Sequence, residues 1–107
     1  MPGSLKWTVT CDIAGLSPKA EIYSVQGGLV RSEPVPCDPP LNCPFPMNNV
    51  QFSRYKAAIV VGSNRYYYVQ GQPLVTLPNQ ESTASVIELS QQNPSEDVTI
   101  SAQSIPA

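Results

Sequence analysis

Hydrophobic and polar residues alternate strictly along residues 5–13, Leu5-Lys6-Trp7-Thr8-Val9-Thr10-Cys11-Asp12-Ile13. In an extended chain successive side chains point to opposite faces, so a period of two predicts a β-strand. The predicted apolar face of this strand consists of Leu5, Trp7, Val9, Cys11 and Ile13.

Weaker segments of strand character follow, each bounded by turn residues. Gly27-Gly28 predicts a hairpin turn, because glycine adopts the positive φ that such turns require. With about seven or eight short strands and no helical periodicity, we expect one all-β domain over residues 1–107. It would be an antiparallel β-sandwich of the immunoglobulin-like or fibronectin type III-like kind. The further strand segments are 19–26, 29–35, 50–61 (bent near Ser53), 65–70, 74–77, 83–89 and 98–104.

Residues 34–46 contain six prolines. Proline cannot donate a hydrogen bond to a sheet, so this segment is expected to be a loop or the edge of a sheet. We expect a rigid loop with polyproline character. It would either connect the two sheets or present a recognition segment to a proline-binding module.

The chain has three cysteines, Cys11, Cys37 and Cys43. Cys37 and Cys43 bracket part of the proline-rich segment and can form a disulfide, although an intracellular setting would argue against one. Cys11 lies on the apolar face of the first strand, where a buried thiol is expected.

The number and distribution of charged residues argue against several classes of binding partner. Charged residues make up 13% of the chain, the net charge is −2, and the six Lys and Arg residues are scattered singly. No basic stripe is present to neutralise phosphates, so we expect neither nucleic-acid binding nor attraction to an anionic membrane surface. No segment reaches the roughly 20 apolar residues of a membrane span. No signal-peptide pattern is visible, so we expect a cytoplasmic protein or secretion by an unconventional route.

The sequence contains no histidine, the commonest general base and metal ligand. It has no Cys-x-x-Cys pair, and its eight acidic residues form no recognisable constellation. We therefore expect no enzymatic activity, no cofactor and no metal site.

Aromatic residues offer the best candidates for binding. Tyr66, Tyr67 and Tyr68 are consecutive, so Tyr66 and Tyr68 share one face of a strand and Tyr67 lies on the other. Exposed tyrosines would stack on sugars or partner proteins, and Arg65 would add bidentate hydrogen bonds. Alternatively, Tyr66 and Tyr68 pack inside and Tyr67 forms a cross-strand pair. Trp7 is either a core aromatic or an anchor at a dimer interface.

Two segments resemble the fungal immunomodulatory proteins. Trp7-Thr8-Val9-Thr10-Cys11-Asp12-Ile13-Ala14-Gly15-Leu16-Ser17 is similar to that family's aromatic-x-Leu-x-Trp-Asp-Val-x-x-Leu-Ser stretch, and 55–62 is similar to its Tyr-x-hydrophobic run before a Gly hairpin. The resemblance implies a fibronectin-type sandwich and a homodimer that binds cell-surface glycans or glycoproteins. The positions matching the family's dimer-forming residues are Leu5, Trp7, Val9 and Cys11. The proline-rich segment and the three cysteines depart from the family pattern.

From these observations we expect a non-enzymatic binding protein, lectin-like or immunomodulatory. Its expected ligand-binding residues are Arg65, Tyr66, Tyr67 and Tyr68. The alternative is a structural subunit that assembles with further copies of itself. The low charge, the many Ser and Thr residues and the expected strand edges are also compatible with this alternative.

Overall fold

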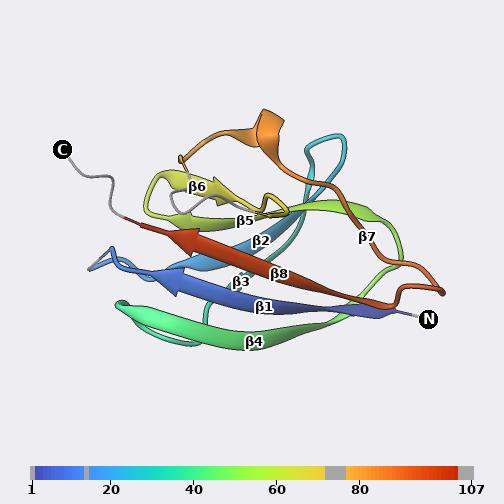
Figure 1. The fold of residues 1–107 in the computed structure, drawn as a ribbon, viewed down its shortest axis with the longest axis horizontal. Coiled ribbons are helices and arrows are strands. Elements are labelled where there is room, and N and C mark those ends of the chain that lie inside the picture. Colours follow the sequence, from blue (N-terminus) through green and yellow to red (C-terminus); the bar gives the residue numbers. More distant parts are fainter. Residues whose placement is uncertain (1, 14, 72–76, 104–107) are drawn as a thin grey trace.

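The computed structural model describes residues 2–13, 15–71 and 77–103, and these form two packed β-sheets (Figure 1). A three-stranded sheet has the order β4-β1-β8, and a larger sheet has the order β3-β2-β5-β6, with β7 paired to β5. The predicted β-sandwich is confirmed, whereas the finer immunoglobulin or fibronectin type III assignment stays a prediction. The elements are β1 (Gly3–Cys11), β2 (Lys19–Ser24), β3 (Leu29–Pro34), β4 (Leu41–Val50), β5 (Arg54–Val61), β6 (Asn64–Tyr67), the 3-10 helix η1 (Glu81–Thr83), β7 (Ile87–Glu88) and β8 (Ser95–Ala102).

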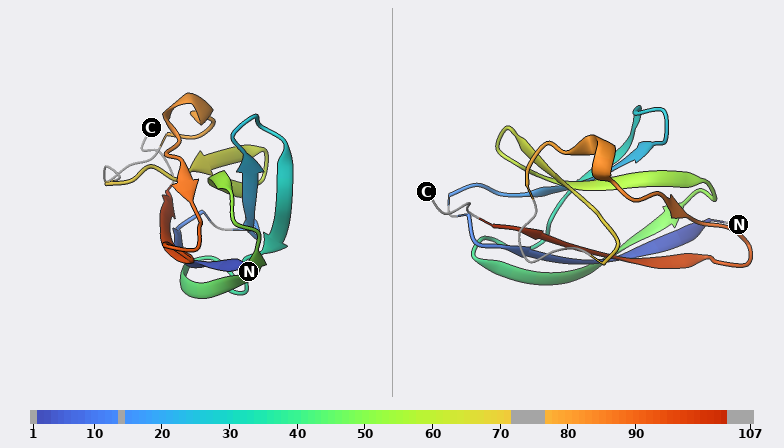
Figure 2. Two further views of the ribbon diagram at one scale, coloured as in Figure 1. Left: turned by 90° about the vertical axis from the view of Figure 1, so that its right-hand side faces the viewer. Right: turned by 45° about the horizontal axis from the view of Figure 1, so that its top comes forward.

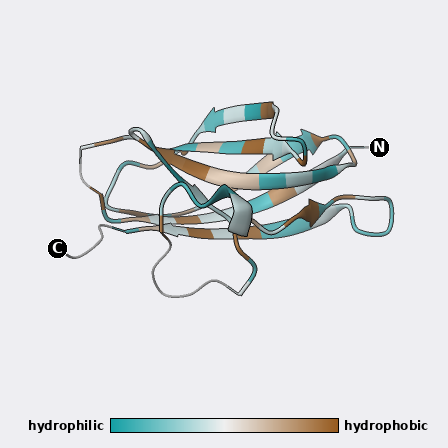
Figure 3. Ribbon diagram, turned by 90° about the horizontal axis from the view of Figure 1, so that it is seen from above, coloured by the Kyte–Doolittle hydropathy of each residue, from teal (hydrophilic) through white to brown (hydrophobic). Residues whose placement is uncertain are grey.

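The alternation of apolar and polar residues along the strands determines which side chains form the core. Along β1 the residues of the apolar face are buried, whereas Lys6 between them is exposed. The same alternation recurs in β8, where Val98 and Ile100 are fully buried. Hydrophobic and hydrophilic bands follow one another along the strands (Figure 3). The two sheets lie face to face (Figure 2), and the buried apolar residues of both form one core cluster.

One strand pair corrects the expectation of a purely antiparallel sandwich. β1 pairs with β8 in parallel, from Ser4 opposite Ser95 to Cys11 opposite Ala102. Alternating polarity is the same in parallel and antiparallel strands, so the sequence pattern carries no information about strand direction.

The expected loop over 34–46 is also corrected, because its second half belongs to β4. Pro44 and Pro46 lie in this strand, opposite Thr8 and Lys6 of β1. β4 is an outer strand of its sheet, and an outer strand tolerates proline because backbone groups along one side need no partner strand. Residues 41–46 therefore lie at the edge of a sheet, which was the other expectation for this segment.

Other segments are shorter than expected. The predicted strand over 83–89 is reduced to β7, and Glu81–Thr83 forms η1 instead. The strand expected over 50–61 is interrupted at 51–53, near the expected bend. The strand expected over 74–77 lies almost wholly outside the described residues.

Arg31 bridges β3 and β4, which are outer strands of different sheets. Its two terminal nitrogens donate to the carbonyl oxygens of Asn48 and Asn49, at 2.6 and 2.8 Å, and Nη1 lies 3.4 Å from Glu33. A guanidinium suits this role because its fork of donors reaches two acceptors at once. Arg31 thus links one outer strand of each sheet, β3 and β4.

Cys37 and Cys43 form a disulfide with a Cα–Cα distance of 6.1 Å. Cys43 is buried in β4, so the bridge fastens the segment before β4 to the core. Cys11 is a buried free thiol, as expected.

We predict that reducing this disulfide lowers the free energy of unfolding by about 2 kcal/mol, because the bridge closes a loop with a sequence separation of 6. Urea unfolding with and without reductant measures the difference. The variant Cys37→Ser, which keeps the buried Cys43, should not respond to reductant. An equal response of variant and wild type would contradict the prediction.

Candidate functional site

The outer face of the larger sheet carries a cluster of four polar and aromatic side chains, which we call the outer-face cluster: Glu21, Tyr23, Arg65 and Tyr67. Strand register explains how they meet. Glu21 of β2 lies opposite Ala58 of β5, and Ala58 lies opposite Tyr67 of β6. Ala58 is fully buried and has only a methyl group, so the larger side chains on either side close over it.

Hydrogen bonds connect three members of the cluster. Tyr23 donates its phenolic proton to Glu21 Oε1 and accepts a hydrogen bond from Arg65 Nε at 2.9 Å. Arg65 Nε also lies 3.6 Å from Glu21 Oε1. The Glu21 side chain is only 9% exposed, whereas that of Arg65 is 44% exposed. A buried carboxylate therefore anchors a guanidinium that still reaches solvent.

The cluster changes the acid–base behaviour of Tyr23. Burial, and then the hydrogen bond to Glu21, raise the pKa of Tyr23 to about 12, although Arg65 acts in the opposite direction. Burial likewise raises the pKa of Tyr67. Both phenols consequently stay protonated under ordinary conditions and act as neutral hydrogen-bonding groups.

The segment around η1 fixes β6 from outside (Figure 1). Asn79 accepts a hydrogen bond from the Arg65 N–H through Oδ1 at 2.9 Å, and its own N–H donates to the Arg65 carbonyl at 2.6 Å. Ser85 N–H donates to the Tyr68 carbonyl at 2.9 Å. These contacts hold the backbone of Arg65 in place on an outer strand.

Only two of the four residues expected to bind a ligand lie in the cluster. Arg65 and Tyr67 belong to it, and the centroid of the Tyr67 ring lies 6.4 Å from that of Tyr23. Tyr66 is 3% exposed and belongs to the core, and Tyr68 is partly buried against that core. Tyr66 and Tyr68 therefore follow the alternative expectation, in which they pack inside.

Glu21 and Tyr23 were not among the residues expected from the sequence. Both are outward-facing residues of β2, and no local motif marks them. Their importance depends on the pairing of β2 with β5 and of β5 with β6, which brings residues 42 positions apart into hydrogen-bonding distance.

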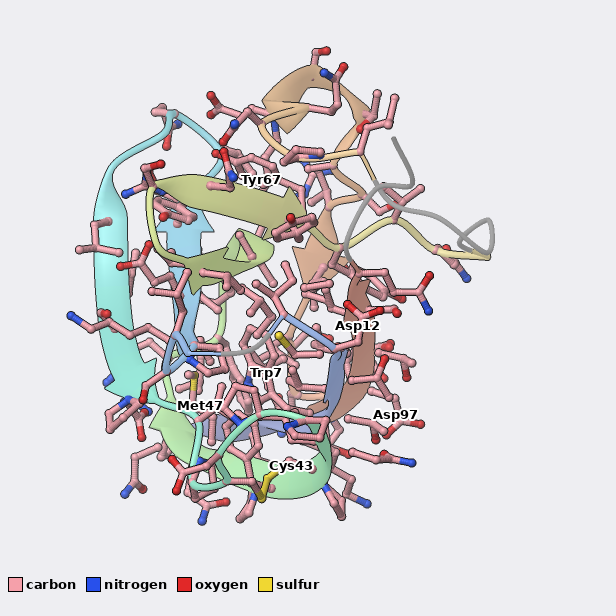
Figure 4. All side chains as sticks on the ribbon, turned by 90° about the vertical axis from the view of Figure 1, so that its left-hand side faces the viewer. Trp7, Asp12, Cys43, Met47, Tyr67 and Asp97 are labelled. Atoms are coloured by element: carbon pink, nitrogen blue, oxygen red, sulfur yellow. A yellow bond between two sulfur atoms is a disulfide. The ribbon has the colours of Figure 1, made fainter. Side chains whose placement is uncertain are left out.

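The residues expected to form a dimer lie in the core instead. Leu5 and Val9 are fully buried, Trp7 is 1% exposed and Cys11 is 3% exposed. Within one chain these side chains pack into the core, and the expectation of a dimer contact through them stays a prediction. Trp7 points into the space between the sheets (Figure 4).

Among the described residues, no group of three or more His, Cys, Asp or Glu residues could hold a metal ion. No helix in the same residues is long and apolar enough to cross a membrane.

Comparison with models of known protein families and with curated proteins finds no match to this chain. The resemblance to the fungal immunomodulatory proteins therefore remains a prediction.

Proposed function

We propose that this β-sandwich is a non-enzymatic, lectin-like protein that binds cell-surface glycans or glycoproteins through the outer-face cluster. The observation that carries the proposal is the half-exposed guanidinium of Arg65, anchored beside Tyr23 by the buried Glu21 carboxylate.

A sugar presents an apolar C–H face and a rim of hydroxyl groups. Tyrosine suits such a ligand, because its ring packs against the apolar face while its hydroxyl remains a polar contact. Guanidinium groups donate parallel hydrogen bonds to neighbouring oxygen atoms. Among the described residues, the side-chain contacts of Arg65 involve Nε, so its terminal nitrogens can donate to such a ligand.

Preorganisation supports the same function. Arg65 is held through its backbone by Asn79 and through Nε by Tyr23. A side chain already fixed in its binding position loses less conformational entropy when the ligand arrives, so more of the interaction energy appears as affinity.

A glycan array followed by titration of the bound sugars tests the proposal. Arg65→Ala should weaken binding about tenfold or more, because charge-assisted hydrogen bonds to the ligand are lost. Arg65→Lys should restore only part of the affinity, since an ammonium lacks the planar fork.

Arg54→Ala is the matched control. Arg54 is an exposed arginine of the same sheet, 64% exposed and 3.6 Å from Glu88, so its removal should leave glycan binding unchanged. The proposal fails if the wild-type protein binds no glycan and no cell surface, or if Arg65→Ala binds as the wild type does.

A further inference from the structure

The outer face of the three-stranded sheet contains a second candidate surface, a shallow depression of about 560 Å³. We call it the β1 groove. Three strands contribute the outward-facing side chains that line it: Lys6, Thr8, Pro44, Pro46, Asp97 and Thr99.

Strand register arranges these side chains in two rows of three. Lys6 lies between Pro46 of β4 and Asp97 of β8. In the next row, two residues along the strands, Thr8 lies between Pro44 and Thr99. Because neighbouring strands are about 4.8 Å apart and alternate residues about 7 Å apart, the array spans roughly 10 by 7 Å, the size of a mono- or disaccharide.

The groove offers hydrogen-bonding groups of every kind that a hydroxylated ligand uses. Lys6 supplies a donor, Asp97 supplies acceptors, and the hydroxyl of Thr99 does both. Lys6 and Asp97 are neighbours in register, yet no ion pair joins them among the described residues. Both charged groups are exposed, and Asp97 points away from the core (Figure 4).

The β4 side of the groove is apolar. Pro44 and Pro46 are both exposed, and their rings flank the polar residues of β1. On the core-facing side of the same strand pair, Phe45 stacks on Trp7 with ring centroids 5.9 Å apart, which ties β4 to β1 next to the prolines. The groove thus has an apolar side on β4 and a polar side on β1 and β8, which complements a ligand with one apolar face and a polar rim.

The geometry points to the β1 groove as a second saccharide site, and this inference rests on the proposed function of the outer-face cluster. The two sites lie on opposite outer faces of the sandwich, with Tyr67 and Asp97 on different sides of the core (Figure 4). A single copy of the chain would then bridge two glycans and agglutinate cells without forming a dimer.

The experiment is an NMR titration of the ¹⁵N-labelled protein with lactose, N-acetylglucosamine, mannose and N-acetylneuraminic acid, each added separately. At least one sugar should shift the amide signals of Thr8, Asp97 and Thr99. Asp97→Asn should raise the dissociation constant at these signals about tenfold, since the amide replaces a charged acceptor.

Ser101→Ala is the control, because Ser101 pairs with Thr10 in the row beyond the groove and should leave sugar binding unchanged. Shifts confined to the amides of Tyr23 and Arg65 would overturn the second site while supporting the proposed function. Shifts at neither face with any of the four sugars would count against both.

Agglutination of red blood cells provides a second readout. Arg65→Ala and Asp97→Asn should each abolish it, and an equimolar mixture of the two variants should not restore it, since neither carries both sites. Full agglutination by the Asp97→Asn variant would contradict bridging through the β1 groove.

Discussion

Replacing Trp7 by alanine is expected to lower the free energy of unfolding by about 3–5 kcal/mol, the largest effect of any single substitution considered for this chain. Trp7 is 1% exposed, lies in the middle strand of the three-stranded sheet and stacks on Phe45. Truncation removes its buried apolar surface and leaves a cavity that a sheet held on both sides cannot close. Urea unfolding followed by far-UV circular dichroism measures the loss.

Two variants test whether this cost comes from burial. Trp7→Phe should lose much less, because a phenyl ring keeps the stacking and lacks the indole N–H, which has no hydrogen-bond partner among the described residues. Lys6→Ala, on the opposite face of the same strand, should change stability by no more than about 0.5 kcal/mol. Equal losses for Trp7→Ala and Lys6→Ala would contradict the assignment of Trp7 to the core.

Alkaline pH is expected to unfold the protein. Burial raises the pKa of Tyr23 from 10.0 to about 12 and also raises the pKa values of Tyr55, Tyr66, Tyr67 and Tyr68. The folded chain therefore retains protons that the unfolded chain releases. The stability from these groups is fully present below pH 10 and is lost as the pH rises toward 12. Urea midpoints measured across this range, together with phenolate absorbance, test the prediction.

The variant Tyr23→Phe measures how much of this pH-dependent stability comes from the outer-face cluster. This variant should lose about 1 kcal/mol at neutral pH, since a hydrogen bond to Glu21 disappears. It should lose less than the wild type between pH 10 and 12, because one titrating phenol is gone. A wild-type stability that stays constant up to pH 12 would be incompatible with these raised pKa values.

The fold was predictable where alternation was strong. The strict period along β1 located its buried face, and a continuous run of apolar residues such as 57–61 is typical of a strand buried on both sides. β5 does lie between β2 and β6, and Ala58 on its outer face is fully buried. Such patterns reflect burial, which is a property of each residue's own position.

Which strands pair, and in which direction, was not predictable from the sequence in the same way. The parallel alignment of β1 with β8, and the entry of Pro44 and Pro46 into β4, depend on which strands become neighbours. The same limit applies to the candidate site. Arg65 and Tyr67 stood out by residue type, whereas Glu21 and Tyr23 gained their role from a register spanning three strands.

The outer strands bear on the alternative of a self-assembling subunit. β4 contains two prolines, and β3 ends at Pro34 and has an irregularity where Leu29 and Arg31 pair with successive residues of β2. Arg31 and Glu33 also add charge to this edge. Each feature hinders another chain from extending the sheet. Fibril growth by strand addition is therefore disfavoured along β3 and β4, which is consistent with the proposed role as a dispersed binding protein.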